Sequence, residues 1–138
     1  MSAKHILVVE CNAEEATSIR KALKGLPFCT SFLCRSLGEA RAYLAGAGIY
    51  KDRENYPTPD AIVTEFRLGG DSAYELIVWI RGHASSARIP IYVLARELSA
   101  NDEKMLSMLN LKAIIRKESD SGAFAEQLRR LADQVCGA

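Results

Sequence analysis

The sequence has no strong excess of charge and no long hydrophobic run. Its 18 basic and 17 acidic residues give a formal net charge of +1, so electrostatics does not favour nucleic acid or an anionic membrane as a partner. The longest purely aliphatic run, Ile6 to Val9, is far shorter than the ~20 residues that a membrane helix needs. The first residues contain no secretory cleavage pattern. We therefore predict a cytoplasmic protein that binds neither nucleic acid nor membrane.

Motifs for metal binding and catalysis are also missing. The cysteines form no Cys-x-x-Cys pair, and no histidine lies at zinc-finger spacing. The chain lacks a Gly-x-Ser-x-Gly elbow, a metal-ligand helix motif and a pair of nucleophile and base, so we expect no enzyme activity. In a reducing compartment we expect the cysteines to be free thiols. They are Cys11, Cys29, Cys34 and Cys136.

What the chain does contain is an alternation of short apolar runs with amphipathic stretches. Its 138 residues, 49% of them hydrophobic, suffice for one domain over residues 1–138 with its own core. Continuous apolar runs are typical of parallel strands that are buried on both faces. The five runs are Ile6–Val9, Ser31–Cys34, Ala61–Val63, Ile91–Leu94 and Ala113–Ile115, of which the second is the weakest.

Helical patterns lie between these runs, because apolar residues recur every three to four positions. The clearest stripes contain Ala16, Ile19 and Leu23; Leu37, Ala40 and Leu44; Ala73, Leu76, Ile77 and Ile80; and Phe124, Leu128, Leu131 and Val135. The helix around residues 101–109 is weaker and could be capped by Ser99 or Asn101. We interpret residues 45–59 as an exposed loop. The order predicts an α/β fold, a doubly wound five-stranded parallel sheet in three α/β/α layers.

Functional residues of an open parallel sheet gather where strands end, at the carboxyl edge. The first strand is followed by Glu10 and Cys11, the third ends at Glu65, and the fifth is followed by Lys117. Since these ends meet at one edge, we expect the four side chains to lie together.

The ordered set of strand ends resembles the receiver domain of bacterial response regulators, over almost the whole chain. The motifs that carry this resemblance are Val8 to Asn12, Pro59 to Leu68, Ile89 to Ala95 and Ile114 to Lys117. It implies a flavodoxin-like (βα)5 receiver fold and a role in two-component phosphorelay signalling. By resemblance, Glu65 stands at the phospho-acceptor position, Glu10 and Cys11 at the acidic pair, Ala95 and Ile114 at the switch positions, and Lys117 at the family's lysine.

Most of these positions depart from the family pattern. An active receiver holds Mg²⁺ with carboxylates, whereas a cysteine at the second position of the pair is a soft ligand that suits Mg²⁺ poorly. Glu65 is one methylene longer than the family's aspartate, Ala95 replaces a hydroxyl residue and Ile114 replaces an aromatic one. Because phosphoryl transfer depends on positioning and charge, these defects should multiply. We therefore expect no phosphorylation at Glu65, no cofactor and poor Mg²⁺ binding.

The sequence favours a degenerate receiver, or pseudo-receiver, that acts by protein–protein interaction. The partner could be a sensor kinase, an output protein or a second copy of the chain. Trp79, Met105 and Met108 are candidate interface residues, although core packing explains them equally well. One alternative is a conventional receiver with a non-standard acceptor such as Asp60 or Asp71. Another is a flavodoxin-like protein that binds a small ligand or a metal.

The retained lysine leaves two further interpretations open. An ion pair between Glu65 and Lys117 could stand in permanently for the phosphorylated state. It could also only neutralise a partly buried charge, because leaving either partner alone in the interior is costly.

Overall fold

The computed structural model describes residues 3–136, and a five-stranded parallel sheet lies at its centre. The strands are β1 (Lys4–Val9), β2 (Cys29–Cys34), β3 (Ala61–Glu65), β6 (Ile91–Ala95) and β7 (Ala113–Arg116). Their order in the sheet is β2-β1-β3-β6-β7, and each neighbouring pair is parallel. The order reverses between β1 and β3, which places a functional crevice at the carboxyl ends of these two strands.

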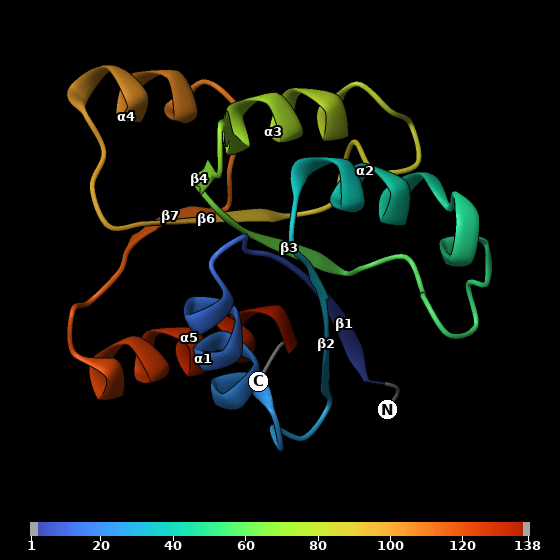
Figure 1. The fold of residues 1–138 in the computed structure, drawn as a ribbon, viewed down its shortest axis with the longest axis horizontal. Coiled ribbons are helices and arrows are strands. Elements are labelled where there is room, and N and C mark those ends of the chain that lie inside the picture. The colour runs from blue at the N-terminus through green and yellow to red at the C-terminus, as the bar shows by residue number, and fades with distance from the viewer. Residues whose placement is uncertain (1–2, 137–138) are drawn as a thin grey trace.

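Helices cover both faces of the sheet. They are α1 (Ala13–Leu23), α2 (Leu37–Ala45), α3 (Ala73–Arg81), α4 (Ala100–Ser107) and α5 (Ser121–Cys136). Figure 1 shows α1 and α5 on one side of the sheet, and α2, α3 and α4 on the other. The predicted three-layer α/β/α fold is therefore confirmed.

Alternation along the strands explains why one short apolar run supports both helix layers. Leu7 and Val9 pack with residues of α2 and α3, whereas Ile6 and Val8 pack with residues of α1 and α5. Successive side chains of a strand point to opposite faces, so a strand between two helix layers is apolar along a continuous run of residues. All five residues of β6 are buried for this reason.

The connection over residues 45–59 is largely exposed, as predicted, but it has a regular structure of its own. It contains a short 3-10 helix, η1 (Gly48–Lys51), and three aromatic rings pack together around it. The ring of Tyr50 lies 4.9 Å from that of Tyr43 and 5.1 Å from that of Tyr56. The Arg53 guanidinium donates hydrogen bonds to the carbonyls of Leu44 and Tyr56 at 3.0 and 3.1 Å. These contacts hold the connection against α2.

The segment after β3 forms a small hairpin that the sequence pattern did not predict. Its strands are β4 (Arg67–Leu68) and β5 (Asp71–Ser72), joined by a turn in which Gly69 has a φ of +69°. Glycine adopts this left-handed conformation without steric cost. The predicted boundaries also shift slightly, because β2 begins at Cys29 and α4 ends at Ser107. Within residues 3–136, no helix is both long and apolar enough to cross a membrane.

Candidate functional site: a buried cluster of one lysine and three glutamates

A buried charged cluster lies at the carboxyl ends of β1, β3 and β7. Glu10, Glu65 and Lys117 are only 1%, 8% and 7% exposed. The Lys117 ammonium donates hydrogen bonds to Glu10 Oε1 at 3.2 Å and to Glu15 Oε2 at 2.8 Å. It also forms an ion pair with Glu65. A single cation therefore binds three carboxylates inside the crevice.

Backbone hydrogen bonds to neighbouring strands fix the ends that carry these side chains. The Glu10 amide donates to the Cys34 carbonyl at 3.0 Å, which extends the pairing of β1 and β2 by one residue. The Lys117 amide donates to the Ala95 carbonyl at 2.9 Å in the same way. Because the sheet continues through these positions, the charged side chains are held rigidly where the strands end.

Glu15 belongs to the cluster, and the sequence analysis did not identify it. It lies in the first turn of α1, where the Asn12 side chain caps the helix by accepting a hydrogen bond from the Glu15 amide at 2.9 Å. Glu15 also forms an ion pair with Arg96, which follows β6. The available signal was the N-cap: a capping Asn three residues after the end of β1 starts the helix close to the strand ends, and Glu15 is the third residue of that helix.

Burial and the charges of neighbouring side chains shift the pKa values of the cluster. Burial and, to a smaller extent, the charges of Glu10 and Glu15 raise the pKa of Glu65 to about 7, although Lys117 acts in the opposite direction. Burial also acts to raise the pKa of Glu15, but Lys117 and Arg96 outweigh it and hold that pKa below its usual value. Burial acts to lower the pKa of Lys117, yet the three glutamates raise it overall. Lys117 is thus charged at neutral pH, while Glu65 is the carboxylate that readily takes a proton.

The same carboxylates have the chemistry of a divalent-cation site. One oxygen from each of Glu10, Glu15 and Glu65 lies within 4.8 Å of the others. Mg²⁺ takes carboxylate oxygens as ligands. However, the Lys117 ammonium contacts all three carboxylates, so a cation entering the cluster would meet a fixed positive charge. The residues do not fit a bound Mg²⁺ while Lys117 is in this position.

Cys11 was expected to join the cluster, but its thiol turns elsewhere. It donates a hydrogen bond to the Arg67 carbonyl, at 3.6 Å, in the small hairpin. Ala95 is 1% exposed and packs with the layer of α2 and α3, and Ile114 is half-buried beside the same core. Three of the four expected residues therefore meet. Within residues 3–136, the ion pairs of Lys117 are with glutamates, and the Cys11 thiol is not one of its partners.

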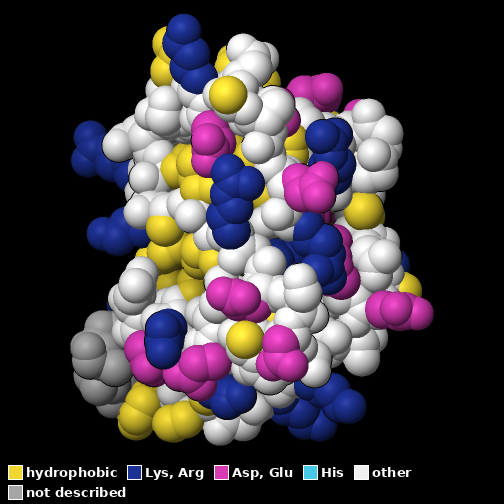
Figure 2. All heavy atoms as spheres, turned by 90° about the vertical axis from the view of Figure 1, so that its left-hand side faces the viewer, with side chains coloured by type: hydrophobic (Ala, Val, Ile, Leu, Met, Phe, Trp, Pro, Cys, Tyr) yellow, Lys and Arg dark blue, Asp and Glu magenta, His cyan; other side chains and the backbone are white. Residues whose placement is uncertain are grey.

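The candidate interface residues separate into two kinds. Trp79 on α3 is half-buried, packs against the core and stacks on His83 with ring centroids 4.0 Å apart. Met105 and Met108, in and directly after α4, are 37% and 77% exposed, while Leu106 between them is fully buried. In Figure 2, apolar side chains on the face that carries α4 are surrounded by charges of both signs.

No protein-family model and no curated protein matches the chain. Solved structures of response regulators do resemble it. The phosphorylated cyanobacterial phytochrome response regulator RcpA is 23% identical, with a TM-score of 0.87 over 96% of this chain and 93% of that one. The Mn²⁺-bound form of the response regulator Rcp1 is 22% identical, with a TM-score of 0.83 over 94% and 92%.

A third similar structure is the response regulator RPA3017, from red-light signalling of R. palustris. It is 14% identical, with a TM-score of 0.83 over 94% of this chain and 92% of that one. The chain has the receiver fold. Since the receiver fold covers nearly the full length of both molecules, the charged cluster occupies the carboxyl edge of a receiver sheet.

Proposed function

We propose that the chain is a receiver-type module of two-component signalling that acts by binding another protein, without phosphorylation at Glu65. The observation that carries this proposal is the buried ion pair between Lys117 and Glu65. The carboxylate at the proposed acceptor position, Glu65, is already paired with the Lys117 ammonium. The proposal includes no catalytic activity, no cofactor and a cytoplasmic location.

The chemistry of the crevice supports the absence of phosphoryl transfer. Such transfer needs an ionised acceptor, a cation that neutralises the phosphoryl oxygens and donors that follow the group. A pKa of about 7 leaves Glu65 partly protonated, and a protonated carboxyl is a poor nucleophile. Cys11 offers no carboxylate to hold the cation, because its side chain is a thiol that donates to the Arg67 carbonyl. Ala95 has no hydroxyl that could donate to the phosphoryl group. Each of the three requirements is therefore compromised.

The surface around α4 supports a role in protein binding. A cavity of about 190 Å³ lies between the small hairpin and α4. Its lining includes Phe66, Tyr74 and Met105, and the exposed Met108 lies one helical turn beyond Met105. Methionine and aromatic side chains are enriched in protein interfaces. We propose that this surface binds a sensor kinase, an output protein or a second copy of the chain.

Photosensory kinases are the first partners to test. RcpA and the similar structure AtBRR are described as phytochrome and bacteriophytochrome response regulators, and RPA3017 belongs to red-light signalling. These descriptions hold for those proteins. Because this chain is similar to them in structure, a binding experiment should begin with a photosensory kinase.

The central test is incubation with acetyl phosphate and Mg²⁺ followed by intact mass measurement, with a conventional receiver treated in parallel. We expect no added phosphoryl group on this chain. A stoichiometric, acid-labile adduct that disappears in the Glu65→Gln variant would refute the proposal. An adduct that persists in that variant would support the alternative acceptors. Of these, Asp60 lies at the opposite edge of the sheet, where its carboxylate accepts a hydrogen bond from the His5 amide at 2.8 Å.

The flavodoxin-like alternative is tested by the purified protein itself. The first turn of α1, where such a protein would bind a phosphate, contains Glu14 and Glu15. Negative side chains at this end of a helix repel a phosphate. A coloured protein, or a stoichiometric metal in elemental analysis, would favour this alternative over protein binding.

A further inference from the structure

Two half-buried cysteines face each other at the edge of the sheet opposite to the charged cluster. Cys29 is the first residue of β2, and Cys136 is the last residue of α5. The Cys136 thiol donates a hydrogen bond, at 3.4 Å, to the carbonyl of Phe28, which directly precedes Cys29. The end of the last helix therefore lies against the start of the second strand.

The two thiols also interact with each other. Burial, together with the charge of the neighbouring Cys136 side chain and a hydrogen bond to it, raises the pKa of Cys29 to about 11. Cys34 is fully buried, and the side chains that act on its thiol are those of Glu39 and Tyr50. Cys11 donates its hydrogen bond at the other edge of the sheet. Among the four cysteines, Cys29 and Cys136 are the ones whose side chains meet.

We propose that Cys29 and Cys136 form a redox-sensitive modification site, which closes into an intramolecular disulfide when the protein meets a peroxide. Disulfides of this kind are reversible in reducing compartments, where they occur as redox-sensing bonds. The site is independent of the proposed signalling function, because it shares no residue with the charged cluster or with the surface around α4.

The backbone on both sides of the pair is anchored, which favours closure without refolding. The Lys4 amide donates to the Phe28 carbonyl at 2.8 Å and holds the start of β2 beside β1. Phe28 has a φ of +66°, and this bend leads the chain directly into Cys29. On α5, Leu128 and Leu131 are buried in the core shared with α1. The two cysteines thus start from fixed and adjacent positions.

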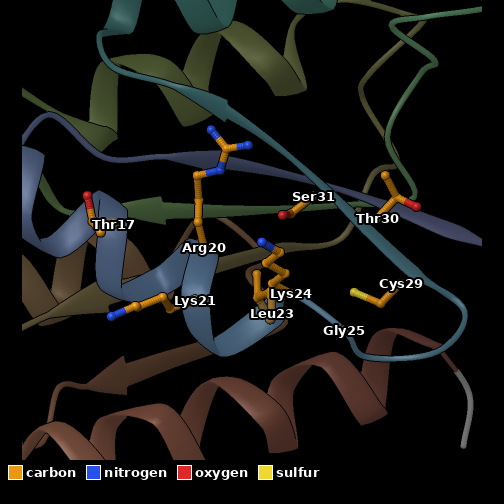
Figure 3. Close-up of a pocket in the computed structure, with 9 residues that line it drawn as sticks. All are labelled: Thr17, Arg20, Lys21, Leu23, Lys24, Gly25, Cys29, Thr30 and Ser31. Atoms are coloured by element: carbon orange, nitrogen blue, oxygen red, sulfur yellow. The ribbon is translucent and has the colours of Figure 1, made fainter.

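An open groove gives solvent and small oxidants access to Cys29, and Cys136 is itself only half-buried. It has a volume of about 600 Å³ and is lined by Cys29 together with residues of α1 and β2. Figure 3 shows Cys29 at one end of this groove, on the side of β2 where the last turn of α5 lies. The basic side chains of Arg20 and Lys24 line the same groove.

The chemistry balances with hydrogen peroxide as the oxidant. The Cys136 sulfur attacks one peroxide oxygen, the O–O bond breaks, and a sulfenic acid and one water are formed. The Cys29 sulfur then displaces the hydroxyl group from the Cys136 sulfur, the S–S bond forms, and the Cys29 proton leaves with that hydroxyl group as a second water. Two thiols are oxidised and one peroxide is reduced. A small dithiol reverses the reaction by thiol–disulfide exchange.

The test uses the full chain, fully reduced and then treated with hydrogen peroxide. We expect the intact mass to fall by two hydrogen atoms, and a digest without reductant to contain one cross-linked peptide joining Cys29 to Cys136. The Cys136→Ser variant should lose this product. The Cys11→Ser variant is the matched control and should keep it. A linkage through Cys11, a covalent dimer, or oxygen addition without a cross-link would overturn the proposal.

Thermal unfolding gives a second measurement, which does not depend on identifying the cross-linked peptide. The disulfide would close a loop of roughly 100 residues, for which the Tm should rise by on the order of 10 °C. Dithiothreitol should return the Tm to its starting value, and Cys136→Ser should show no rise. Cys136 is at the half-buried end of a helix, so this variant should fold even if Cys29→Ser does not. An unchanged Tm in a chain shown by mass to be cross-linked would contradict the anchored geometry.

Discussion

Lys117 and Glu65 form a buried ion pair although their strands are not neighbours. β6 lies between β3 and β7 in the sheet, so the lysine side chain reaches across the end of β6 to the glutamate. On its way it also binds Glu10 and Glu15. The pair is consequently one part of a network with three carboxylates and one buried ammonium. This imbalance of charge adds to the effect of burial in raising the pKa of Glu65.

The first prediction concerns the protonation of Glu65. We expect its carboxyl group to titrate at about pH 7 in the folded protein, because burial and two neighbouring carboxylates oppose its ionisation. The measurement is a carbon-13 NMR titration of the glutamate carboxyl groups, with Glu65 assigned by its loss in Glu65→Gln. A midpoint near the ordinary value of 4.5 would contradict this description of the network.

The raised pKa has a consequence for stability, and its sign follows from linkage. The folded pKa is above the unfolded value, so the folded state binds the Glu65 proton more tightly. This contribution is fully present below pH 4.5 and is lost as the pH rises through 7. Between about pH 5 and pH 8, the wild type should lose about 2 kcal/mol of unfolding free energy relative to Glu65→Gln. Denaturant unfolding of both proteins at the two pH values measures the difference.

The second prediction is that removing the ammonium turns the cluster into a cation site. Lys117→Met leaves three carboxylates within 4.8 Å of one another in a buried crevice, and it should destabilise the fold by about 3 kcal/mol or more at neutral pH. Mn²⁺ or Mg²⁺ should then raise the Tm of the variant, because the cation restores the missing positive charge.

A matched control separates this effect from nonspecific binding. Lys112 is exposed and lies outside the cluster, so Lys112→Met should neither destabilise the fold nor respond to the cations. The wild type should respond as little as this control. If Lys117→Met is folded by circular dichroism but insensitive to both cations, the cluster is not a latent metal site.

The third prediction assigns Trp79 to the core. The indole packs against buried residues and stacks on His83, so Trp79→Ala should cost about 2 kcal/mol or more of unfolding free energy. A Trp79→Phe variant keeps an aromatic ring and should recover most of this loss. Urea unfolding of the three proteins makes the comparison. Equal stability of Trp79→Ala and the wild type would return Trp79 to the surface candidates.

The fold was predictable because each buried strand is a continuous apolar run. β1, β3 and β6 lie between two helix layers, so both faces are buried and each strand contains a run of apolar residues that leaves a clear pattern. The edge strand β2 is only partly buried, and its first residues, Cys29 and Thr30, gave too weak a signal for its start. The hairpin after β3 is held by two residue pairs and a turn, which is too short for any periodicity.

The site was predictable only in part, because strand ends and helix starts obey different rules. The register of parallel strands brings Glu10, Glu65 and Lys117 to one edge, and residue order alone implies this. Glu15 reaches the same cluster from α1, and the angle at which a helix returns to the sheet is set by tertiary packing. Cys11 shows the opposite case, since its position in the chain was right and the direction of its thiol was decided by the Arg67 carbonyl.

The fourth prediction separates binding from folding at the surface around α4. Met108 is 77% exposed, so Met108→Lys should change the unfolding free energy by less than about 0.5 kcal/mol. The same variant should weaken self-association in sedimentation experiments, or binding to a photosensory kinase, because a charge replaces an apolar contact. Val78 on α3 is 48% exposed and provides the control, Val78→Lys, which should leave both interactions intact. If the two substitutions weaken binding equally, the effect comes from net charge, and the surface around α4 is not the interface.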